Sequence, residues 1–372
     1  MGKIKWWLVC ILAFTGVCLG GGNAFADRTF SDARGRPLVL PDKIDRMICS
    51  GPGCLRLATY LNVQDKVVAV DNIEGRKRVF DARPYALANP GYKQLPVFGG
   101  FRGQDDPEKI LGLDPMPQVI FKTYPELGHD PEELQAKTGI PVVILDYGDL
   151  GRNRSKLFAA MTLMGRVLGP LAEARAKQVV GFFSREIQEL ETRTRDVDHK
   201  KRCFVGGIAF KGPHGFQSTE PFYPPFQLVN AVNIAGQGLP AGREIRHAIF
   251  SKEMLLTADP EVLFLDLSTL QMGEGHGGLA ELKTDPVYQA LTAVDKGEVF
   301  GLLPYNWYTR NFGSVLADAW YIGTVLYPEK FSGIDPRAKA DAIYTFLLGT
   351  PVFETMNKGF GRMAFTRIRL KE

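Results

Sequence analysis

The sequence has few of the residues that hold bare metal ions. It contains only five histidines, and no two of them form an H-x-H or H-x3-H pair. Such close pairs let two imidazoles reach one ion. The scattered positions therefore disfavour direct coordination of a bare metal ion: His129, His199, His214, His247 and His276.

Cysteine is equally scarce, and two of the five cysteines, Cys10 and Cys18, lie in a segment that we expect to be removed. Cys49 and Cys54 flank the sequence Ser-Gly-Pro-Gly. A short-loop disulfide and two separate thiols are both open interpretations of this pair. A C-x4-C pair without a second pair or a nearby histidine is a weak signal for a metal site. Cys203 is the odd cysteine, and we expect it to be buried.

The chain also lacks the short motifs of common enzymes and a strong net charge. There is no G-x-S-x-G, no H-E-x-x-H and no phosphate-binding loop with Gly-Lys-Ser/Thr. The formal net charge is +4, and no stripe of Lys and Arg is visible, which argues against nucleic acid as a partner. A secreted enzyme is therefore the less favoured alternative to a binding protein.

Long apolar runs are absent after the first 26 residues. Residues 1–26 begin with the basic "MGKIK", continue with the apolar "WWLVCILAFTGVCLG" and end with "AFA" before Asp27. This is the pattern of a secretory signal peptide. The apolar run is short for a membrane anchor, which needs about 20 residues, and Val17 before Cys18 disfavours lipidation. We predict cleavage after Ala26 and a soluble protein in the periplasm.

Strand and helix patterns alternate along the rest of the chain. Short β-branched runs such as "KVVAVD", "QVIFK" and "PVVILDY" stand between segments of helical spacing. Residues 155–195 interrupt the alternation with helix only, and then it resumes. The sequence predicts an α/β protein with two similar, mostly parallel lobes. We assign residues 27–170 to the first lobe, 171–196 to a rigid connecting helix and 197–372 to the second lobe.

One phrase occurs twice. "EKILGLDPMPQVIF" covers residues 108–121 and "EMLLTADPEVLFL" covers residues 253–265; in each, Glu is followed six positions later by Asp-Pro and then by a strand pattern. A short sequence pattern of this kind can recur by chance. The alternative that we favour is that each lobe contains the same helix, stop and strand.

Together these features resemble the periplasmic binding proteins that serve ABC importers of ferric siderophores, haem and cobalamin. The resemblance rests on the leader, the paired phrases, "LGPLAEARAKQVV" at the connecting helix and "YQALTAVDKGEVFGL" before the last strand. It covers essentially the whole chain after residue 26, although no single motif is highly specific.

The resemblance implies a ligand cleft between two lobes that close only slightly. It implies no resident cofactor, and a ligand that is an iron or cobalt chelate or, alternatively, an oxyanion such as molybdate or tungstate. Glu108 and Glu253 match the acids that dock each lobe onto a dimeric permease in the inner membrane. They could equally be solvated acids that favour a helix dipole. We expect a monomer.

Candidate ligand residues follow the predicted strands, because ligands of α/β sheets gather at the carboxyl ends of strands. The Ser-Gly-Pro-Gly turn could present backbone N–H groups to an anion or be a simple tight turn. The loop "FKGPHGFQSTEPFYPPF", the basic "GREIRH" and the aromatic "PYNWYTRNF" could bind a chelate or an anionic ligand, or could be ordinary surface segments. The candidates are Ser50, Gly51, Gly53, Tyr124, Tyr147, Lys211, His214, Ser218, Tyr223, Arg243, Arg246, Trp307, Tyr308 and Arg310.

Overall fold

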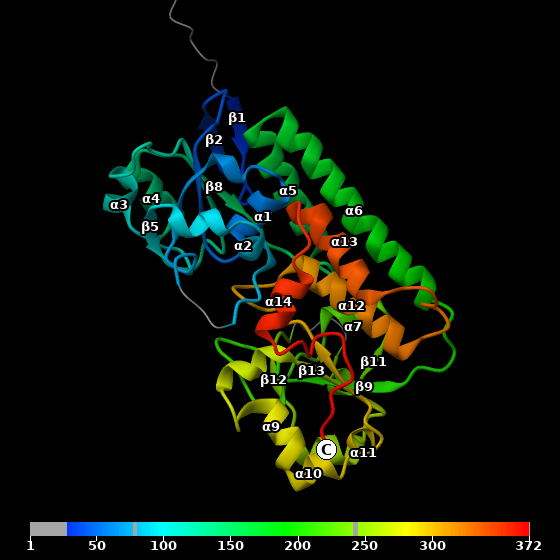
Figure 1. Ribbon diagram of the computed structural model, residues 1–372. Coiled ribbons are helices and arrows are strands. Elements are labelled where there is room, and N and C mark those ends of the chain that lie inside the picture. Colours follow the sequence, from blue (N-terminus) through cyan, green and yellow to red (C-terminus); the bar gives the residue numbers. More distant parts are fainter. Residues whose placement is uncertain (1–27, 77–79, 241–244, 372) are drawn as a thin grey trace, which may run out of the picture.

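The computed structural model describes residues 28–76, 80–240 and 245–371. The predicted leader and Arg243 lie outside this part of the chain. Within it, two α/β lobes follow one another in the sequence, and a long helix runs along one side of the molecule from the first lobe toward the second (Figure 1). The predicted fold class is confirmed.

The first lobe is built on a sheet of six strands among the described residues. Their order is β6-β5-β4-β3-β7-β8, and every neighbouring pair is parallel except β5 and β6. A separate hairpin precedes this sheet. The strands are β1 (Arg28–Ser31), β2 (Pro37–Leu40), β3 (Met47–Ser50), β4 (Val67–Asp71), β5 (Val97–Gly100), β6 (Gln104–Asp105), β7 (Val119–Thr123) and β8 (Val142–Leu145).

Helices cover both faces of this sheet, which is why its strands are continuously apolar. Along β7, Val119 and Phe121 join the main core, whereas Ile120 faces a smaller core on the opposite side. This alternation is the period of two that a strand imposes on its side chains. The helices are α1 (Cys54–Tyr60), α2 (Pro84–Ala88), α3 (Pro107–Leu111) and α4 (Pro131–Thr138), with 3-10 turns at Gln64–Lys66 and Pro90–Gln94.

The second lobe contains a parallel sheet of four described strands in the order β11-β9-β13-β14. A two-stranded ribbon of β10 and β12 lies apart from it. The strands are β9 (Arg202–Gly206), β10 (Ser218–Thr219), β11 (Val232–Asn233), β12 (Ala248–Ile249), β13 (Val262–Asp266) and β14 (Val299–Leu302). Its helices are α7 (Pro224–Leu228), α8 (Lys252–Ala258), α9 (Gly277–Thr284), α10 (Pro286–Gln289) and α11 (Thr292–Asp295), with 3-10 turns at Ile234–Gly236 and Leu267–Met272.

The repeated phrase folds in the same way in both lobes. Its first copy forms α3 and then β7, and its second copy forms α8 and then β13. Both strands have five residues, all of them buried. The recurrence therefore reflects one structural unit used twice.

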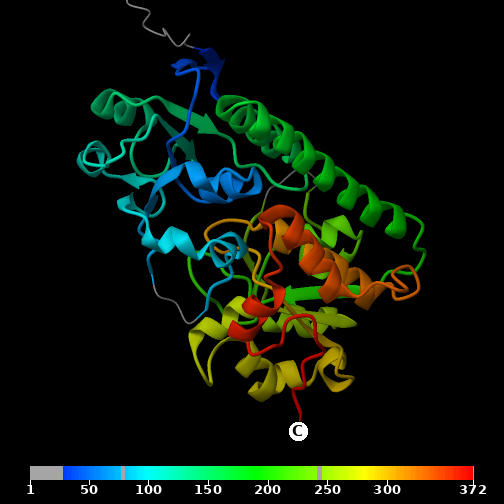
Figure 2. The same cartoon turned by 45° about the horizontal axis from the view of Figure 1, so that its top comes forward.

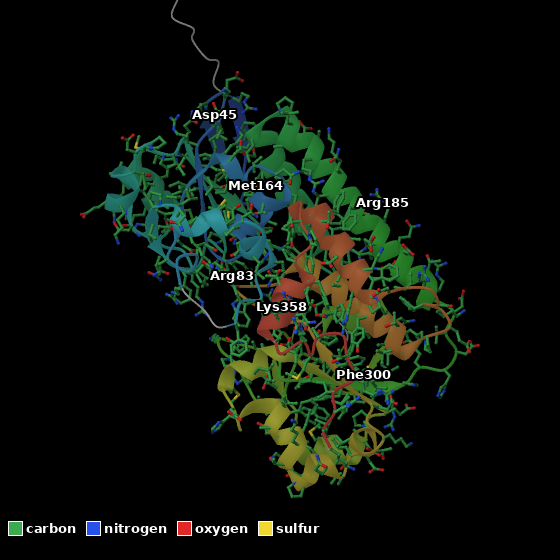
Figure 3. All side chains as sticks on the ribbon, viewed as in Figure 1. Asp45, Arg83, Met164, Arg185, Phe300 and Lys358 are labelled. Carbon is green, nitrogen blue, oxygen red and sulfur yellow. The ribbon has the colours of Figure 1, made fainter. Side chains whose placement is uncertain are left out.

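A helix pair connects the lobes. α5 (Arg154–Leu168) packs against α6 (Pro170–Thr194), whose 25 residues span roughly 37 Å. Met164 of α5 is fully buried, whereas Arg185 lies on the outer side of α6 (Figure 3). The buried Glu186 of α6 accepts hydrogen bonds from the Trp320 indole (2.7 Å) and the Lys339 ammonium (2.9 Å). These contacts attach the connecting helix to the C-terminal helices.

The C-terminal helices touch both lobes. α12 (Phe312–Leu326) packs on α7, whereas α13 (Pro336–Leu348) contacts α1 and α2, and α14 (Phe353–Gly359) contacts α2. Figure 2 shows α13 and α14, in orange and red, lying between the two sheets. The predicted lobe limits at residues 170 and 197 remain predictions.

The three described cysteines are buried free thiols. Burial raises the pKa of Cys54, whose thiol lies 3.3 Å from the carbonyl oxygen of Phe121. Cys49 and Cys54 are thus two separate thiols in the structure and not a disulfide. Cys203 is buried, as expected.

Candidate functional site

A cavity of about 650 Å³ opens between the two lobes. Most of its walls are loops that follow the carboxyl ends of β3, β4, β5 and β7 in the first lobe and of β9, β13 and β14 in the second, which is where α/β sheets gather ligands. Glu220 after β10 and Arg246 before β12 complete the lining. The first lobe contributes Pro52, Ile73, Phe101, Arg102, Tyr124, Glu126 and Leu127. The second contributes Ala209, Phe210, Lys211, Gly212, Glu220, Arg246, Gln271, Tyr305, Asn306, Trp307, Tyr308, Thr309 and Arg310.

Each lobe presents an exposed cation beside an aromatic ring. The Arg102 guanidinium lies 5.2 Å from the Phe101 ring, and the Lys211 ammonium lies 5.5 Å from the Phe210 ring. Among the described residues neither cation forms an ion pair within 4.0 Å. Both charges are therefore available to an anionic ligand, and the two rings offer it flat apolar faces.

A third cation, Arg310, is already engaged. Its guanidinium lies 3.0 Å from the Glu220 carboxylate and 3.5 Å from that of Asp149. These partners come from different lobes, so Arg310 joins the lobes at the base of the cavity. With a side chain only 12% exposed, it contributes less than Arg102 to the charge that a ligand meets.

Left-handed backbone is concentrated at this cavity. Ten described non-glycine residues have positive φ, and half of them line it. Such conformations cost on the order of 1 kcal/mol or more and persist where surrounding contacts enforce them, typically at functional sites. The five are Arg102 (63°), Tyr124 (51°), Lys211 (58°), Tyr308 (51°) and Thr309 (63°).

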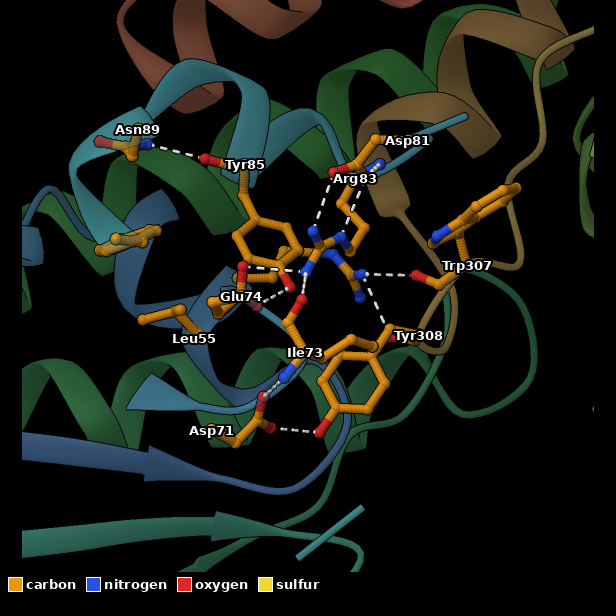
Figure 4. A network of polar contacts seen from close by, with 12 residues as sticks. Leu55, Asp71, Ile73, Glu74, Asp81, Arg83, Tyr85, Asn89, Trp307 and Tyr308 are labelled. Carbon is orange, nitrogen blue, oxygen red and sulfur yellow. Dashed lines mark hydrogen bonds and ion pairs between the residues drawn. The ribbon is translucent and has the colours of Figure 1, made fainter. Parts of the chain in front are cut away.

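Polar contacts with the first lobe hold the aromatic part of the cavity. The Tyr124 hydroxyl lies 2.8 Å from the Thr309 hydroxyl. The Tyr308 hydroxyl donates to the Asp71 carboxylate (Figure 4). It also accepts from the backbone N–H of Arg102 at 3.0 Å. Burial raises the pKa of Asp71 to about 6. The base of the cavity is therefore built jointly by both lobes.

The structure brings six of the predicted ligand residues together. They come from three separate loops and the β12 approach, yet all line the one cavity: Tyr124, Lys211, Arg246, Trp307, Tyr308 and Arg310. Trp307 is the most enclosed of the aromatic rings among them, with 6% of the residue exposed.

The predicted turn residues lie away from the cavity. Ser50 is fully buried, and its hydroxyl bonds the Asp105 carboxylate at 2.9 Å and the Lys122 ammonium at 3.2 Å. Gly51 and Gly53 have positive φ, and a Cβ on either would lie 2.2 Å from the Thr123 carbonyl oxygen or the Tyr147 ring. The turn needs glycine for close packing, and only its Pro52 lines the cavity.

The remaining predicted residues lie beside or beneath the cavity. Tyr147 is buried, and its ring stacks on Phe312. The His214 imidazole bonds the Phe210 carbonyl oxygen at 2.8 Å, and the buried Ser218 hydroxyl bonds the His247 imidazole at 2.9 Å. Tyr223 is fully enclosed by the second lobe.

Sequence reasoning did not find Phe101 and Arg102, nor Phe210 beside the predicted Lys211. A usable signal was present, because an aromatic residue directly followed by a cation stands shortly after a strand in each lobe, at "FR" and "FK". Asn306 and Thr309 lay within the aromatic stretch that the sequence had singled out but were not selected.

The two predicted docking acids have matching positions. Glu108 and Glu253 are exposed in the first turns of α3 and α8. Each helix begins after a capping side chain, Asp106 or Ser251, that accepts from a backbone N–H at 3.2 Å. Exposed apolar side chains follow each acid, including Leu111 and Met254.

Two lobes, a stiff connecting helix and a shared cavity define a two-lobed ligand-binding protein. The chain belongs to the family described as Periplasmic binding protein, whose model matches residues 48–305. It is accordingly a solute-binding protein of the ABC-transporter type and not an enzyme, as the sequence resemblance predicted.

Individual relatives are distant. The iron-uptake system-binding protein of Bacillus subtilis (strain 168) is 22% identical over 255 residues, which are 63% of this chain and 74% of that protein. An ABC transporter solute-binding protein from Sulfurospirillum deleyianum has a TM-score of 0.64 at 20% identity, covering 90% of this chain and 99% of its own. The molybdate-binding protein of Haemophilus influenzae has a TM-score of 0.65 at 18% identity, covering 87% and 99%. At these identities the solved structures show the shared fold alone.

Two further features are absent from the described part of the chain. In the described ranges, no helix is both long and apolar enough to cross a bilayer. The same residues contain no group of three or more His, Cys, Asp or Glu arranged to hold a metal ion.

Proposed function

We propose that this protein captures an anionic metal chelate, of the ferric-siderophore kind, and delivers it to an ABC permease. The observation that carries the proposal is the pairing of Arg102 with Phe101 on one wall of the cavity and of Lys211 with Phe210 on the other. Cations that lack carboxylate partners attract an anion, and aromatic faces cover a planar or apolar chelator.

The chemistry of the cavity favours a metal that arrives already coordinated. No histidine lines the cavity among the described residues, and the tyrosine hydroxyls there are engaged. Tyr124 bonds Thr309, Tyr305 bonds Glu220, and Tyr308 bonds Asp71. A haem iron that needs an axial ligand would have to displace one of these bonds, whereas a chelate with a filled coordination sphere would not.

Cavity size supports a chelate over an oxyanion. The 650 Å³ space is in the range that drug-sized ligands occupy. A tetrahedral oxyanion needs only the volume of a few water molecules, about 30 Å³ each. Ser50, which was predicted for anion binding, is committed to a buried ion pair, so a small oxyanion would lack a close cage at that turn.

Three of the relatives are described by iron compounds, whereas the Haemophilus influenzae protein binds molybdate. The three are the iron-uptake system-binding protein of Bacillus subtilis, a haem-binding protein of Vibrio cholerae and an Fe3+-hydroxamate transport protein of Saccharomonospora viridis. We further propose that the chain is exported by its leader and acts as a monomer in the periplasm. Docking on a dimeric permease would use Glu108 and Glu253.

The test is to purify residues 27–372 from periplasm without refolding and measure the absorption spectrum and metal content. The metal-free protein is then titrated with ferric tris-catecholate, a ferric hydroxamate, haemin, cyanocobalamin and molybdate, with Trp fluorescence as the readout. We expect one ferric chelate per chain and no response to molybdate. Tight binding of molybdate with none of the chelates would overturn the proposal.

A further inference from the structure

The segment of residues 307–310, here called the cleft segment, follows β14 of the second lobe but is also bound by the first. The hydroxyls of Tyr308 and Thr309 bond Asp71 and Tyr124. The carbonyl oxygen of Arg310 accepts from the Tyr147 hydroxyl at 2.8 Å. The cleft segment therefore joins the two lobes, because the Arg310 guanidinium also binds Glu220 of the second lobe and the Asn311 amide donates to the carbonyl oxygens of Trp307 and Thr309.

One side chain binds the backbone of the cleft segment at three points. Arg56 of α1 is fully buried, and its guanidinium donates to the carbonyl oxygens of Trp307 (3.3 Å), Tyr308 (3.3 Å) and Arg310 (2.6 Å). The first two bonds are drawn in Figure 4. The same group also donates to the Tyr147 hydroxyl.

A buried guanidinium of this kind is unusual in its partners. Among the described residues no carboxylate lies within 4.0 Å of the Arg56 guanidinium. The groups that stabilise its positive charge are carbonyl oxygens and the ring of Tyr85, whose centroid is 5.1 Å away. Burying a charge without an opposite charge is costly. An apolar residue would avoid the buried charge but would leave these carbonyl oxygens without a donor, so the choice of arginine depends on the segment that it contacts.

The backbone of the cleft segment supplies a reason. Tyr308 and Thr309 are both left-handed, with φ of 51° and 63°, and neither is glycine. Two consecutive residues in this region relax to ordinary backbone unless external bonds hold them. A guanidinium has five N–H donors in a planar fork and can serve several carbonyls at once, which the ammonium of lysine cannot do with the same geometry.

We propose that Arg56 is a positioning residue of the ligand site. It holds the cleft segment in its left-handed conformation before any ligand arrives and so presents Trp307 and Tyr308 to the cavity. Its effect on ligand affinity rests on the function proposed above, whereas its effect on the conformation of the cleft segment does not.

Tryptophan fluorescence can test both parts separately. A chain of residues 27–372 has two tryptophans, Trp307 in the cavity and the fully buried Trp320, because Trp6 and Trp7 precede it. Acrylamide quenching is compared between the unmodified chain and Arg56→Lys, with Trp307→Phe to assign the signal. The control is Arg175→Lys, since the Arg175 guanidinium also binds carbonyl oxygens of separate segments, Tyr60 and Phe346, but lies outside the cavity.

We expect the quenching of Trp307 to rise at least about twofold in Arg56→Lys without ligand, since the freed segment opens locally. Affinity for ferric tris-catecholate should fall roughly tenfold. Arg175→Lys should change neither. If Arg56→Lys does not fold, Arg56→Gln decides, because its shorter, neutral amide removes the buried charge and cannot reach all three carbonyl oxygens of the cleft segment. A shift in the same direction is expected.

The two proposals fail in different ways. If the unmodified chain binds no chelate but Trp307 becomes exposed in Arg56→Lys, the proposed ligand is wrong and the positioning role stands. If Arg56→Lys folds and leaves both quenching and chelate affinity unchanged, Arg56 is not a positioning residue. The same conclusion follows if only Arg56→Gln folds and it leaves both quenching and chelate affinity unchanged.

Discussion

The Tyr308 hydroxyl donates a hydrogen bond to the carboxylate of Asp71, which stands 237 positions earlier at the end of β4. Tyr308 lines the cavity, and Asp71 belongs to the core of the other lobe. Burial raises the pKa of Asp71 from its ordinary 3.8 to about 6. The bond that joins the lobes therefore contains a group that titrates under mildly acidic conditions.

The stability of the protein should depend on this titration. Between about pH 4 and pH 6 the folded protein holds a proton on Asp71 that the unfolded chain has lost, so the free energy of unfolding falls as pH rises through this window. Asp71→Asn should remove that contribution and gain on the order of 2 kcal/mol at pH 7. Urea unfolding across the pH range checks this. Asp266, whose pKa burial raises to about 7, is the same in both proteins and cancels in the difference. Parallel curves for the two proteins would contradict the assignment.

Removing the cavity cations should weaken binding of an anionic chelate. Arg102→Gln and Lys211→Gln should each lower affinity for ferric tris-catecholate by roughly tenfold, the size of one hydrogen bond to a charged group. The dependence of affinity on salt should also become weaker. Lys93→Gln is the control, because Lys93 is exposed and does not line the cavity. Equal affinities for all three variants would rule out a role for these charges.

Reversing the docking charges should separate transport from binding. Glu108→Lys and Glu253→Lys should leave chelate affinity unchanged and reduce uptake in cells at least about tenfold, since a rim charge acts on encounter with its partner. Glu173→Lys is the matched control. Glu173 also lies in a first helical turn, but in α6, along the opposite edge of the molecule from α3 (Figure 1). Unimpaired uptake by both reversed variants would show that docking uses other residues.

The thiols should be unreactive until the protein unfolds. Cys49, Cys54 and Cys203 are buried, and burial raises the pKa of Cys203 as well as that of Cys54, so little thiolate is present to react. In the chain of residues 27–372, a thiol reagent should label none of the three in native protein and all three in denaturant. One labelled thiol in denaturant without reductant would instead reveal a disulfide between Cys49 and Cys54.

The first lobe should depend strongly on a buried ion pair. The Lys122 ammonium lies 2.5 Å from the Asp105 carboxylate, and both side chains are fully buried. Lys122→Met should cost about 3–5 kcal/mol of unfolding free energy, because it leaves Asp105 charged and unpaired. The double variant Lys122→Met with Asp105→Leu should recover part of that loss. A double variant less stable than the single one would show that the charges are not the cause.

Local order along the chain was readable from the amino-acid pattern. The alternation of apolar runs, the proline and glycine stops and the long helical stretch predicted two α/β lobes joined by one long helix at residues 171–196, where the structure has α6. Each of these signals depends only on residues that are close together in the sequence. The repeated phrase led to α3 with β7 and to α8 with β13 for the same reason.

The composition of the cavity was decided by tertiary contacts. Ser50 and Tyr223 resemble Tyr308 as polar candidates in loops or at strand ends, yet packing buried the first two in the lobes and left the third at the cavity. Arg56 reads as an ordinary helical residue in "CLRLATY", and its role arises from carbonyl groups more than 250 positions away. Periodicity fixes which face of an element is apolar. Only the approach of the two lobes determines which polar groups meet, because those contacts join residues that no local pattern relates.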